Sequence, residues 1–334
     1  MFKKITTAAV SLFTVICLCG CSLTEREIIE TTHETDVPPH MLFLGDSIAA
    51  GYGLDGYTSS DNYSCNSYSN ILKERYTTEF GDNYTHEMQN FAVSGDTSSD
   101  LLELIDSGKL DSALAKSDAV VVSIGGNDML HIMFDLFNDL GIQSKSSFDL
   151  DSIDILGAAA SLITMDSEID KALDEYEINL KEISAKLNER SDGAIYMQNL
   201  YNPLETFDNI PMVIEFSEDK IGRFNEIIKN NAGEGYTIID VAADFEGKCG
   251  ELTRIGSMDI HPNEEGHKVI AESVDAAFRA TGFSYTIQEY GEPHLTLSSV
   301  LLILGGVCAM LLVVMVIIPK MFKSNDEKKN LKEK

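Results

Sequence analysis

The sequence predicts an α/β fold in which a mostly parallel sheet of five strands carries helices on both faces. Short apolar runs typical of buried strands alternate with longer segments of helical periodicity. The strand-like runs are Met41 to Leu44, Met88 to Val93, Ala119 to Ile124, Ala194 to Leu200 and Tyr236 to Val241. The helical segments are Tyr68 to Phe80, Ser98 to Ala115, Ile169 to Leu187, Glu218 to Asn231 and Glu264 to Ala280. Such alternation indicates parallel strands connected through helices.

Residues 1–21 precede this pattern and are typical of an export signal. Two lysines give a basic start, an apolar stretch follows, and small residues stand near its end. The last four residues resemble the bacterial lipobox, in which Cys21 becomes the lipidated first residue of the mature chain. Because Cys19 is unusual at its place in that motif, ordinary cleavage or an uncleaved anchor stays open. Residues 22–40 are rich in Thr and Glu and predict a flexible tether.

The predicted domain covers residues 41–283, and a linker at 284–294 leads to an apolar segment. Residues 295–318 are 24 consecutive uncharged residues. As a helix they extend about 36 Å, which is enough to cross a bilayer. The tail at 319–334 holds six lysines. This excess of positive charge predicts a cytoplasmic C-terminus and a domain on the extracytoplasmic side, in a Gram-positive type of bacterial envelope.

The net charge limits the possible partners, and the cysteines limit the possible disulfides and metal sites. The formal net charge is -29, and because so acidic a surface repels phosphate backbones, we expect no nucleic-acid partner. Of six cysteines, only Cys65 and Cys249 lie in the predicted domain. In an exported chain these two can form a disulfide, or they can remain free thiols. No cysteine or histidine spacing is typical of a metal site, so we expect no metal.

A candidate nucleophile stands where the first predicted strand ends. The stretch from Met41 to Gly53 reads MLFLGDSIAAGYG, so an apolar run breaks at Gly45 into an acid and a serine. Open α/β sheets place their chemistry at the carboxyl ends of strands, and the small residues after the serine let a substrate approach the backbone. Ser47 is therefore the candidate nucleophile. The alternative is an ordinary serine in a glycine-rich turn.

A serine nucleophile needs a base and donors for the negative oxygen that forms on attack. Gly95 follows the second predicted strand and can present a backbone N–H, and Asn127 follows the third and can present a side-chain amide. His261 follows the fifth and offers an imidazole. Each has a plainer interpretation, as a turn glycine, a helix cap and a histidine without a catalytic role. Four such positions after four different strands favour a common site.

At these positions the chain resembles the SGNH (GDSL) hydrolase family. That family has GDS after the first strand, a glycine block, a G-x-N-D block and a final D-x-x-H-P block, matched here by Ser47, Gly95, Asn127 and His261. The resemblance covers about residues 41–283. It implies a flavodoxin-like three-layer α/β/α sandwich and ester hydrolysis without metal or cofactor. In that mechanism Ser47 attacks the acyl carbon and His261 acts as base and then acid. The N–H groups of Ser47 and Gly95 and the Asn127 amide form the oxyanion hole.

The chain departs from the family pattern in the last block. The family's acid stands three residues before the histidine, where this chain has Met258. Asp259 stands only two residues before His261. Either Asp259 reaches the imidazole through a shifted turn, or a backbone carbonyl or a water orients His261 in a dyad. Asp259 is our candidate for the third catalytic residue.

Two connections are longer than ordinary ones. Gly53 to Ser67 is polar and rich in Tyr, Ser and Asn, so it forms either a wall against which a sugar stacks or a plain polar loop. Met129 to Met165 carries apolar stretches. It forms either a lid or acyl pocket beside the site or a helix and hairpin that cover the sheet.

The expected protein is a membrane-anchored serine esterase. Its substrates are small acyl esters, free or on a polysaccharide, of carbohydrate or other envelope and extracellular material. A lysophospholipase or thioesterase is the alternative enzyme. Because Met258 replaces an acid, a catalytically silent surface-binding module on the same scaffold is the alternative outside the enzymes.

Overall fold

The computed structural model describes residues 24–80, 87–129, 132, 155–208, 211–233 and 235–320. The chain divides into two compact units. The larger one runs from Glu34 to Tyr285, close to the predicted domain of residues 41–283, and the smaller one combines Met1–His33 with Thr286–Lys334.

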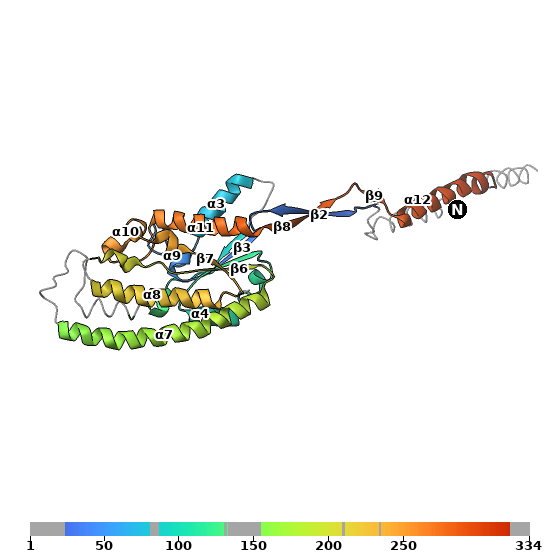
Figure 1. Ribbon diagram of the computed structural model, residues 1–334. Helices are drawn as coiled ribbons and strands as arrows, with labels where there is room; N and C mark the ends of the chain where they lie inside the picture. The colour runs from blue at the N-terminus through green and yellow to red at the C-terminus, as the bar shows by residue number, and fades with distance from the viewer. Residues whose placement is uncertain are drawn as a thin grey trace, which may run out of the picture. The chain divides into compact units, whose positions relative to one another are not determined.

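The larger unit is built on a parallel sheet with the strand order β4-β3-β5-β6-β7 (Figure 1). The strands are β3 (His40–Gly45), β4 (Glu87–Asn90), β5 (Ala119–Ser123), β6 (Ala194–Gln198) and β7 (Thr237–Ile239). All five predicted strands are confirmed. Numbered along the sheet's own sequence, this order is 2-1-3-4-5, and in such sheets the ligand crevice lies beside the first strand, where the strand order reverses.

Helices cover both faces of this sheet. The longer ones are α3 (Tyr68–Phe80), α4 (Ser98–Asp106), α7 (Ile155–Arg190), α8 (Pro211–Asn231) and α11 (Glu264–Thr281). Short helices are α2 (Ser47–Ala50), α5 (Asp111–Leu114), α9 (Val241–Phe245) and α10 (Cys249–Leu252), with 3₁₀ turns η3 (Pro203–Thr206) and η4 (Ile255–Ser257). In Figure 1, α4, α7 and α8 lie on one side of the sheet and α3, α9 and α11 on the other.

Alternate residues of β3 enter two separate apolar cores, as the pleat of a strand requires. Leu42 and Leu44 pack in the core beneath α4, α7 and α8. Met41 and Phe43 pack in the core beneath α3, α9 and α11. The expected three-layer α/β/α sandwich is therefore confirmed.

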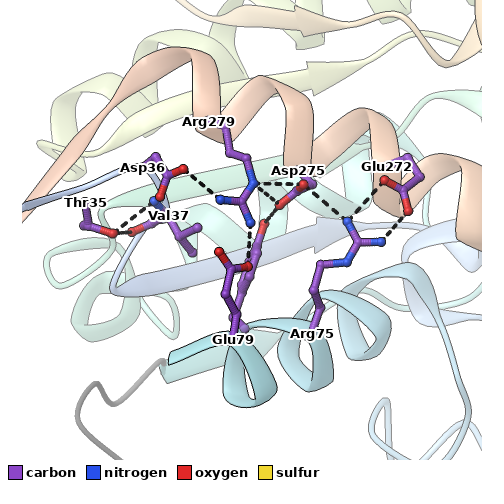
Figure 2. Close-up of polar contacts among 9 residues, drawn as sticks. Thr35, Asp36, Val37, Arg75, Glu79, Glu272, Asp275 and Arg279 are labelled. Atoms are coloured by element: carbon purple, nitrogen blue, oxygen red, sulfur yellow. Dashed lines mark hydrogen bonds and ion pairs between the residues drawn. The ribbon is translucent and has the colours of Figure 1, made fainter. Parts of the chain in front are cut away.

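Ion pairs join the start of the larger unit to two of its helices (Figure 2). Arg279 on α11 contacts Asp36, Glu79 on α3 and Asp275. Arg75 on α3 contacts Asp275 from the other side. Because these contacts link segments about 200 residues apart in the sequence, they hold the entry of the chain against the α3–α11 layer.

Three predicted helices have different bounds in the structure. Helix α8 begins at Pro211, earlier than the predicted Glu218. The segment from Ser98 to Ala115 forms α4 and α5 with a break at Gly108, whose φ of +74° is in the left-handed region that ends helices. Helix α7 begins at Ile155, earlier than predicted, and so contains the second part of the long connection from Met129. Most of the first part of that connection lies outside the described residues.

Two-stranded sheets form where we predicted a flexible tether and a linker. Strand β1 (Thr24–Glu25) pairs with β9 (His294–Leu295), and β2 (Ile28–Thr35) pairs with β8 (Phe283–Tyr290). Residues 22–40 therefore include paired strands, and their flexibility stays a prediction. Their β-branched residues favour strands, but the partner is more than 250 residues away, as in the hydrogen bond from Gln288 to Glu30.

Helix α12 (Leu297–Leu312) continues through the π turn η5 (Val313–Ile317). The helix from Leu297 to Lys320 has 24 residues and a window of mean hydropathy 3.1, so by length and composition it can cross a membrane. The predicted export signal, including Cys21, and the basic tail after Lys320 lie outside the described residues.

Candidate active site

The turn after β3 holds Ser47 at the start of helix α2. Gly45 has a φ of +136°, and a Cβ there would lie 1.9 Å from the Ser123 carbonyl oxygen of β5, so no other residue fits. Asp46 N–H donates to that carbonyl oxygen at 3.0 Å. The Asp46 carboxylate accepts from Ile48 N–H at 3.0 Å and caps α2. The result is a sharp strand-to-helix turn with Ser47 as the first helical residue.

His261 lies against Ser47 although 214 residues separate them in the sequence. Its Nε2 is 2.8 Å from Ser47 Oγ, and its Nδ1 is 2.5 Å from Asp259 Oδ1. A carboxylate only accepts hydrogen bonds, so Nδ1 carries the proton and Nε2 is free to accept the hydroxyl proton of Ser47. The structure therefore brings Ser47, His261 and Asp259 into one chain of hydrogen bonds.

The loop before His261 explains how an acid only two residues away reaches the imidazole. Met258 ends the turn η4 with a φ of 60°, in the left-handed region. The Asp259 carboxylate also accepts from His261 N–H at 3.1 Å, which turns the side chain toward the residues that follow it. An isolated bridge between Thr253 and Pro262 closes the base of the loop.

Two further side chains contact this triad. Arg254 Nε lies 3.1 Å from Asp259 Oδ2, the oxygen that does not face His261. The Tyr52 ring lies 4.7 Å from the His261 ring, centroid to centroid, and its side chain is 42% exposed. The sequence made neither residue a candidate, because only the fold brings them to the histidine.

The turns after β4 and β5 flank the serine turn, because these strands are the two neighbours of β3. Val93 N–H donates to the Gly45 carbonyl oxygen at 2.9 Å. Gly95 is exposed, and a Cβ there would meet no atom within 4 Å. Its φ of +97°, rather than crowding, therefore explains the glycine. The Asn127 amide donates to the Asp96 carbonyl oxygen at 2.9 Å. Gly95 and Asn127 therefore lie in adjoining turns at the carboxyl edge of the sheet.

The stretch that carries this geometry matches a known protein family. A sequence profile of the GDSL-like lipase/acylhydrolase family matches residues 43–269, which is more than half of the chain. The chain belongs to this family. As a GDSL family member it is a carboxylic ester hydrolase, and the resemblance noted in its sequence is confirmed.

Two bacterial relatives and one solved structure extend the comparison. YpmR of Bacillus subtilis (strain 168) is 24% identical over 298 residues, 84% of this chain and 98% of that protein. The spore germination lipase LipC of Bacillus licheniformis is 23% identical over 237 residues, 70% of this chain and 93% of that protein. The lipase Lip_vut3 from a goat rumen metagenome has a TM-score of 0.53 at 20% identity, covering 71% of this chain and 96% of that chain. The last likeness shows the shared fold.

The aspartate of the GDSL motif is buried behind the serine. Burial raises the pKa of Asp46 from 3.8 to about 7, and the negative charge of Asp128 adds to this, against the lowering effect of the Ile48 N–H. A carboxyl with this pKa is partly protonated at neutral pH.

Asp128 connects the G-x-N-D block to helices α4 and α7. Its carboxylate accepts from Ser98 N–H at 2.9 Å and from the Ser98 hydroxyl. Asn179 on α7 donates to the same hydroxyl at 2.9 Å. Burial raises the pKa of Asp128. These contacts fix the turn that carries Asn127 against the start of α4, a role that the G-x-N-D motif alone does not reveal.

A second histidine lies in the core near the site and differs sharply from His261. His267 is fully buried, and its Nδ1 accepts from Tyr68 N–H at 3.2 Å. Burial, followed by the charge of His261, lowers the pKa of His267 to about 3. His267 is therefore neutral near pH 7. It contacts the backbone at the start of α3 rather than Ser47, so its role is structural.

The disulfide considered from the sequence is not formed. Cys65 and Cys249 are both free and buried. The Cys65 thiol lies against the carbonyl oxygens of Ala50 and Gly51, whereas the Cys249 thiol, at the start of α10, donates to the Phe245 carbonyl oxygen at the end of α9. Burial raises the pKa of both thiols, so both behave as small apolar core residues.

Proposed function

We propose that this GDSL hydrolase cleaves esters through Ser47, His261 and Asp259, with Ser47, Gly95 and Asn127 as the oxyanion hole. One observation carries the proposal, namely the 2.8 Å contact between Ser47 Oγ and His261 Nε2. A hydroxyl is a weak nucleophile, and an imidazole in hydrogen-bond contact is the group that activates it.

In the acylation step Ser47 Oγ attacks the acyl carbon and His261 Nε2 takes the hydroxyl proton. Asp259 stabilises the imidazolium that results, because its oxygen already accepts from Nδ1. The negative oxygen faces the Ser47 N–H, which has no helical partner at the start of α2. The Gly95 N–H and the Asn127 amide are the two further donors.

The tetrahedral intermediate collapses when the bond to the alcohol oxygen breaks. His261 returns its proton to that oxygen, the alcohol leaves, and the acyl group stays on Ser47. A water then attacks the acyl carbon while His261 takes its proton, and the carboxylic acid departs as Ser47 regains its hydrogen. The reaction consumes one water and requires no oxidant or cofactor.

We propose small acyl esters of carbohydrate or other envelope material as the substrates. The leaving alcohol receives its proton from His261, so it lies on the side of the site where the Tyr52 ring is exposed. A flat aromatic face with a polar tip suits an alcohol that is itself part of a ring with hydroxyl groups.

Lipolysis, by a lysophospholipase or thioesterase, is the second candidate because the relative LipC is named a spore germination lipase. A panel of esters with acyl chains of two to sixteen carbons separates the two candidates. We expect the highest kcat/KM for the shortest acyl chains. A maximum at long chains, or rapid cleavage of lysophospholipid with acetylated sugars untouched, favours the lipolytic candidate.

Labelling with a fluorophosphonate tests the catalytic proposal and its non-enzymatic alternative. The probe forms a bond only to an activated serine, so we expect labelling of the full chain and none of Ser47→Ala. Ser107→Ala is the control, since Ser107 lies at the far end of α4 and its hydroxyl donates to the Leu104 carbonyl oxygen. Absence of labelling of the wild-type chain supports the catalytically silent binding module.

We propose that the hydrolase unit lies outside the cytoplasm, anchored by the helix Leu297–Lys320 and by a lipid on Cys21. The apolar length of the helix and the lysines after it support this arrangement. Protease added to intact cells should digest the hydrolase unit and spare a tag at the C-terminus. Radioactive palmitate should label the wild-type chain and not Cys21→Ala.

A further inference from the structure

We propose that Arg254 is a positioning residue that holds Asp259 in the orientation from which its carboxylate reaches His261. The inference rests on the proposed roles of Ser47, His261 and Asp259. It goes beyond them, because no motif marks Arg254. The observation behind it is that the two carboxylate oxygens have different partners. Oδ1 contacts His261 Nδ1 at 2.5 Å and Oδ2 contacts Arg254 Nε at 3.1 Å.

This division of partners fixes the plane of the carboxylate. The backbone N–H and the imidazole of His261 both contact Oδ1. With these contacts alone, Oδ2 can still rotate toward water, since the Asp259 side chain is 26% exposed. A second donor on the other oxygen opposes that rotation. The Arg254 side chain is 44% exposed, and ion pairs this exposed add little to stability. Its contribution is therefore one of orientation.

The backbone of Arg254 is itself fixed to the catalytic loop. Its N–H donates to the His261 carbonyl oxygen at 3.0 Å, and its carbonyl oxygen accepts from Ser257 N–H at 2.8 Å. The guanidinium is thus mounted on the same loop that carries the histidine. These bonds fix the backbone from which the side chain extends, and the contact to Asp259 Oδ2 places the guanidinium.

The displaced acid explains why such a residue is needed in this chain. Asp259 follows Met258, which has a φ of 60° in the left-handed region, so the carboxylate approaches His261 through a tight turn. Small rotations of a side chain on so short a connection move its oxygens away from Nδ1. The contact between Arg254 and Asp259 Oδ2 restricts the remaining rotation of the carboxylate.

Steady-state kinetics of the full chain on a short-chain chromogenic ester test this role. We expect Arg254→Ala to lower kcat about tenfold to a hundredfold with KM nearly unchanged, the range seen when residues that orient the ligands of a catalytic metal are removed. Arg254→Lys should recover part of the loss, because an ammonium can still donate to the carboxylate. Arg223→Ala is the matched control. Arg223 is 36% exposed and pairs with two aspartates of α7.

A double-mutant comparison separates positioning from a direct contact with substrate. If Arg254 acts through Asp259, Arg254→Ala should cause no further loss of kcat in the Asp259→Asn background. A full additional loss there, or a rise in KM with kcat unchanged, overturns the proposal. So does a kcat for Arg254→Ala within twofold of the wild type.

The same measurements distinguish this inference from the proposed function. If the wild-type chain hydrolyses esters and labels with fluorophosphonate but Arg254→Ala is unchanged, only the role of Arg254 is wrong. If the wild type neither hydrolyses nor labels, the catalytic proposal is wrong and the role of Arg254 is wrong with it. Equal melting temperatures of Arg254→Ala and Arg223→Ala assign a selective loss of kcat to orientation.

Discussion

At the scale of single residues, the site depends on hydrogen bonds that set protonation and direction. Asp259 accepts from His261 Nδ1 and so fixes the tautomer in which Nε2 faces Ser47. Asp46 lies behind the same serine with a pKa raised to about 7 by burial. One carboxyl is thus placed to orient the base, and the other shapes the turn that presents the nucleophile.

The first prediction concerns the orienting acid. Asp259→Asn replaces an acceptor by a group that can donate to the imidazole, so the wrong tautomer is favoured and kcat should fall by roughly 10⁴. The measurement is initial-rate hydrolysis of a short-chain ester, with Asp192→Asn, an exposed aspartate, as the control. Near-normal turnover of Asp259→Asn is the result that supports a dyad oriented by a backbone carbonyl or water.

The second prediction concerns the buried acid. Because folding raises the pKa of Asp46 from 3.8 to about 7, the folded state binds this proton more tightly than the unfolded state. Its contribution to stability is complete below about pH 4 and is lost as pH rises to about 7, at roughly 1.4 kcal/mol per pH unit. Asp46→Asn keeps the cap acceptor and removes the titration.

Urea unfolding at pH 5 and pH 7 measures this difference. The stability of Asp46→Asn relative to the wild type should rise between the two values. A relative stability that stays constant, or falls with pH, contradicts a raised pKa at Asp46. Asp192→Asn, which removes an exposed carboxyl, should show no such change.

At the scale of structural elements, the loop from Thr253 to Pro262 determines whether the Asp259 carboxylate can reach the His261 imidazole. Its isolated bridge closes the base, and Met258 supplies the left-handed residue at the turn. A β-branched side chain is strongly disfavoured in that conformation. Met258 also packs against the core beneath α7 and α8, so an apolar side chain of similar size is required there.

The third prediction follows from this loop. Met258→Ile keeps the volume but adds a branch at Cβ, so it should cost about 1–2 kcal/mol and lower kcat by displacing Asp259. Met258→Leu, which has no such branch, is the control and should stay close to the wild type. Thermal unfolding and kcat together test this. Equal behaviour of the two variants contradicts a conformational requirement at Met258.

At the scale of the whole molecule, the residues that we propose as catalytic all belong to the unit Glu34–Tyr285. Both apolar cores and the five-stranded sheet also belong to it. The apolar helix from Leu297 to Lys320 belongs to the other unit. The proposed anchor and the proposed catalytic residues therefore lie in different units of the chain.

The fourth prediction is that residues 34–285 form an enzyme on their own. Expressed without the rest of the chain, this segment should be soluble and keep a kcat within a few-fold of the full chain, while the full chain sediments with membranes. Ultracentrifugation and ester hydrolysis measure the two properties. A segment that folds, as judged by circular dichroism, but lacks activity contradicts the assignment.

Much of the fold was predictable because its signals are local. Each strand of the sheet is an apolar run of a few residues, and each covering helix has its own amphipathic period. The paired strands β2 and β8 were not predictable in this way. Strand β2 is exposed and polar for most of its length, and both strands gain hydrogen bonds from a partner at the other end of the chain.

By itself, the sequence determined the nucleophile turn, the three flanking blocks and the hydrolase family, because Gly45, Ser47, Asn127 and His261 stand in motifs with fixed spacing. Only the tertiary structure decided which acid faces His261 and which residues support it. A spacing rule places Asp259 one residue too close, whereas the left-handed Met258 and the guanidinium of Arg254 bring its oxygens to the imidazole. Backbone torsions and long-range contacts of this kind leave no pattern in the order of residues.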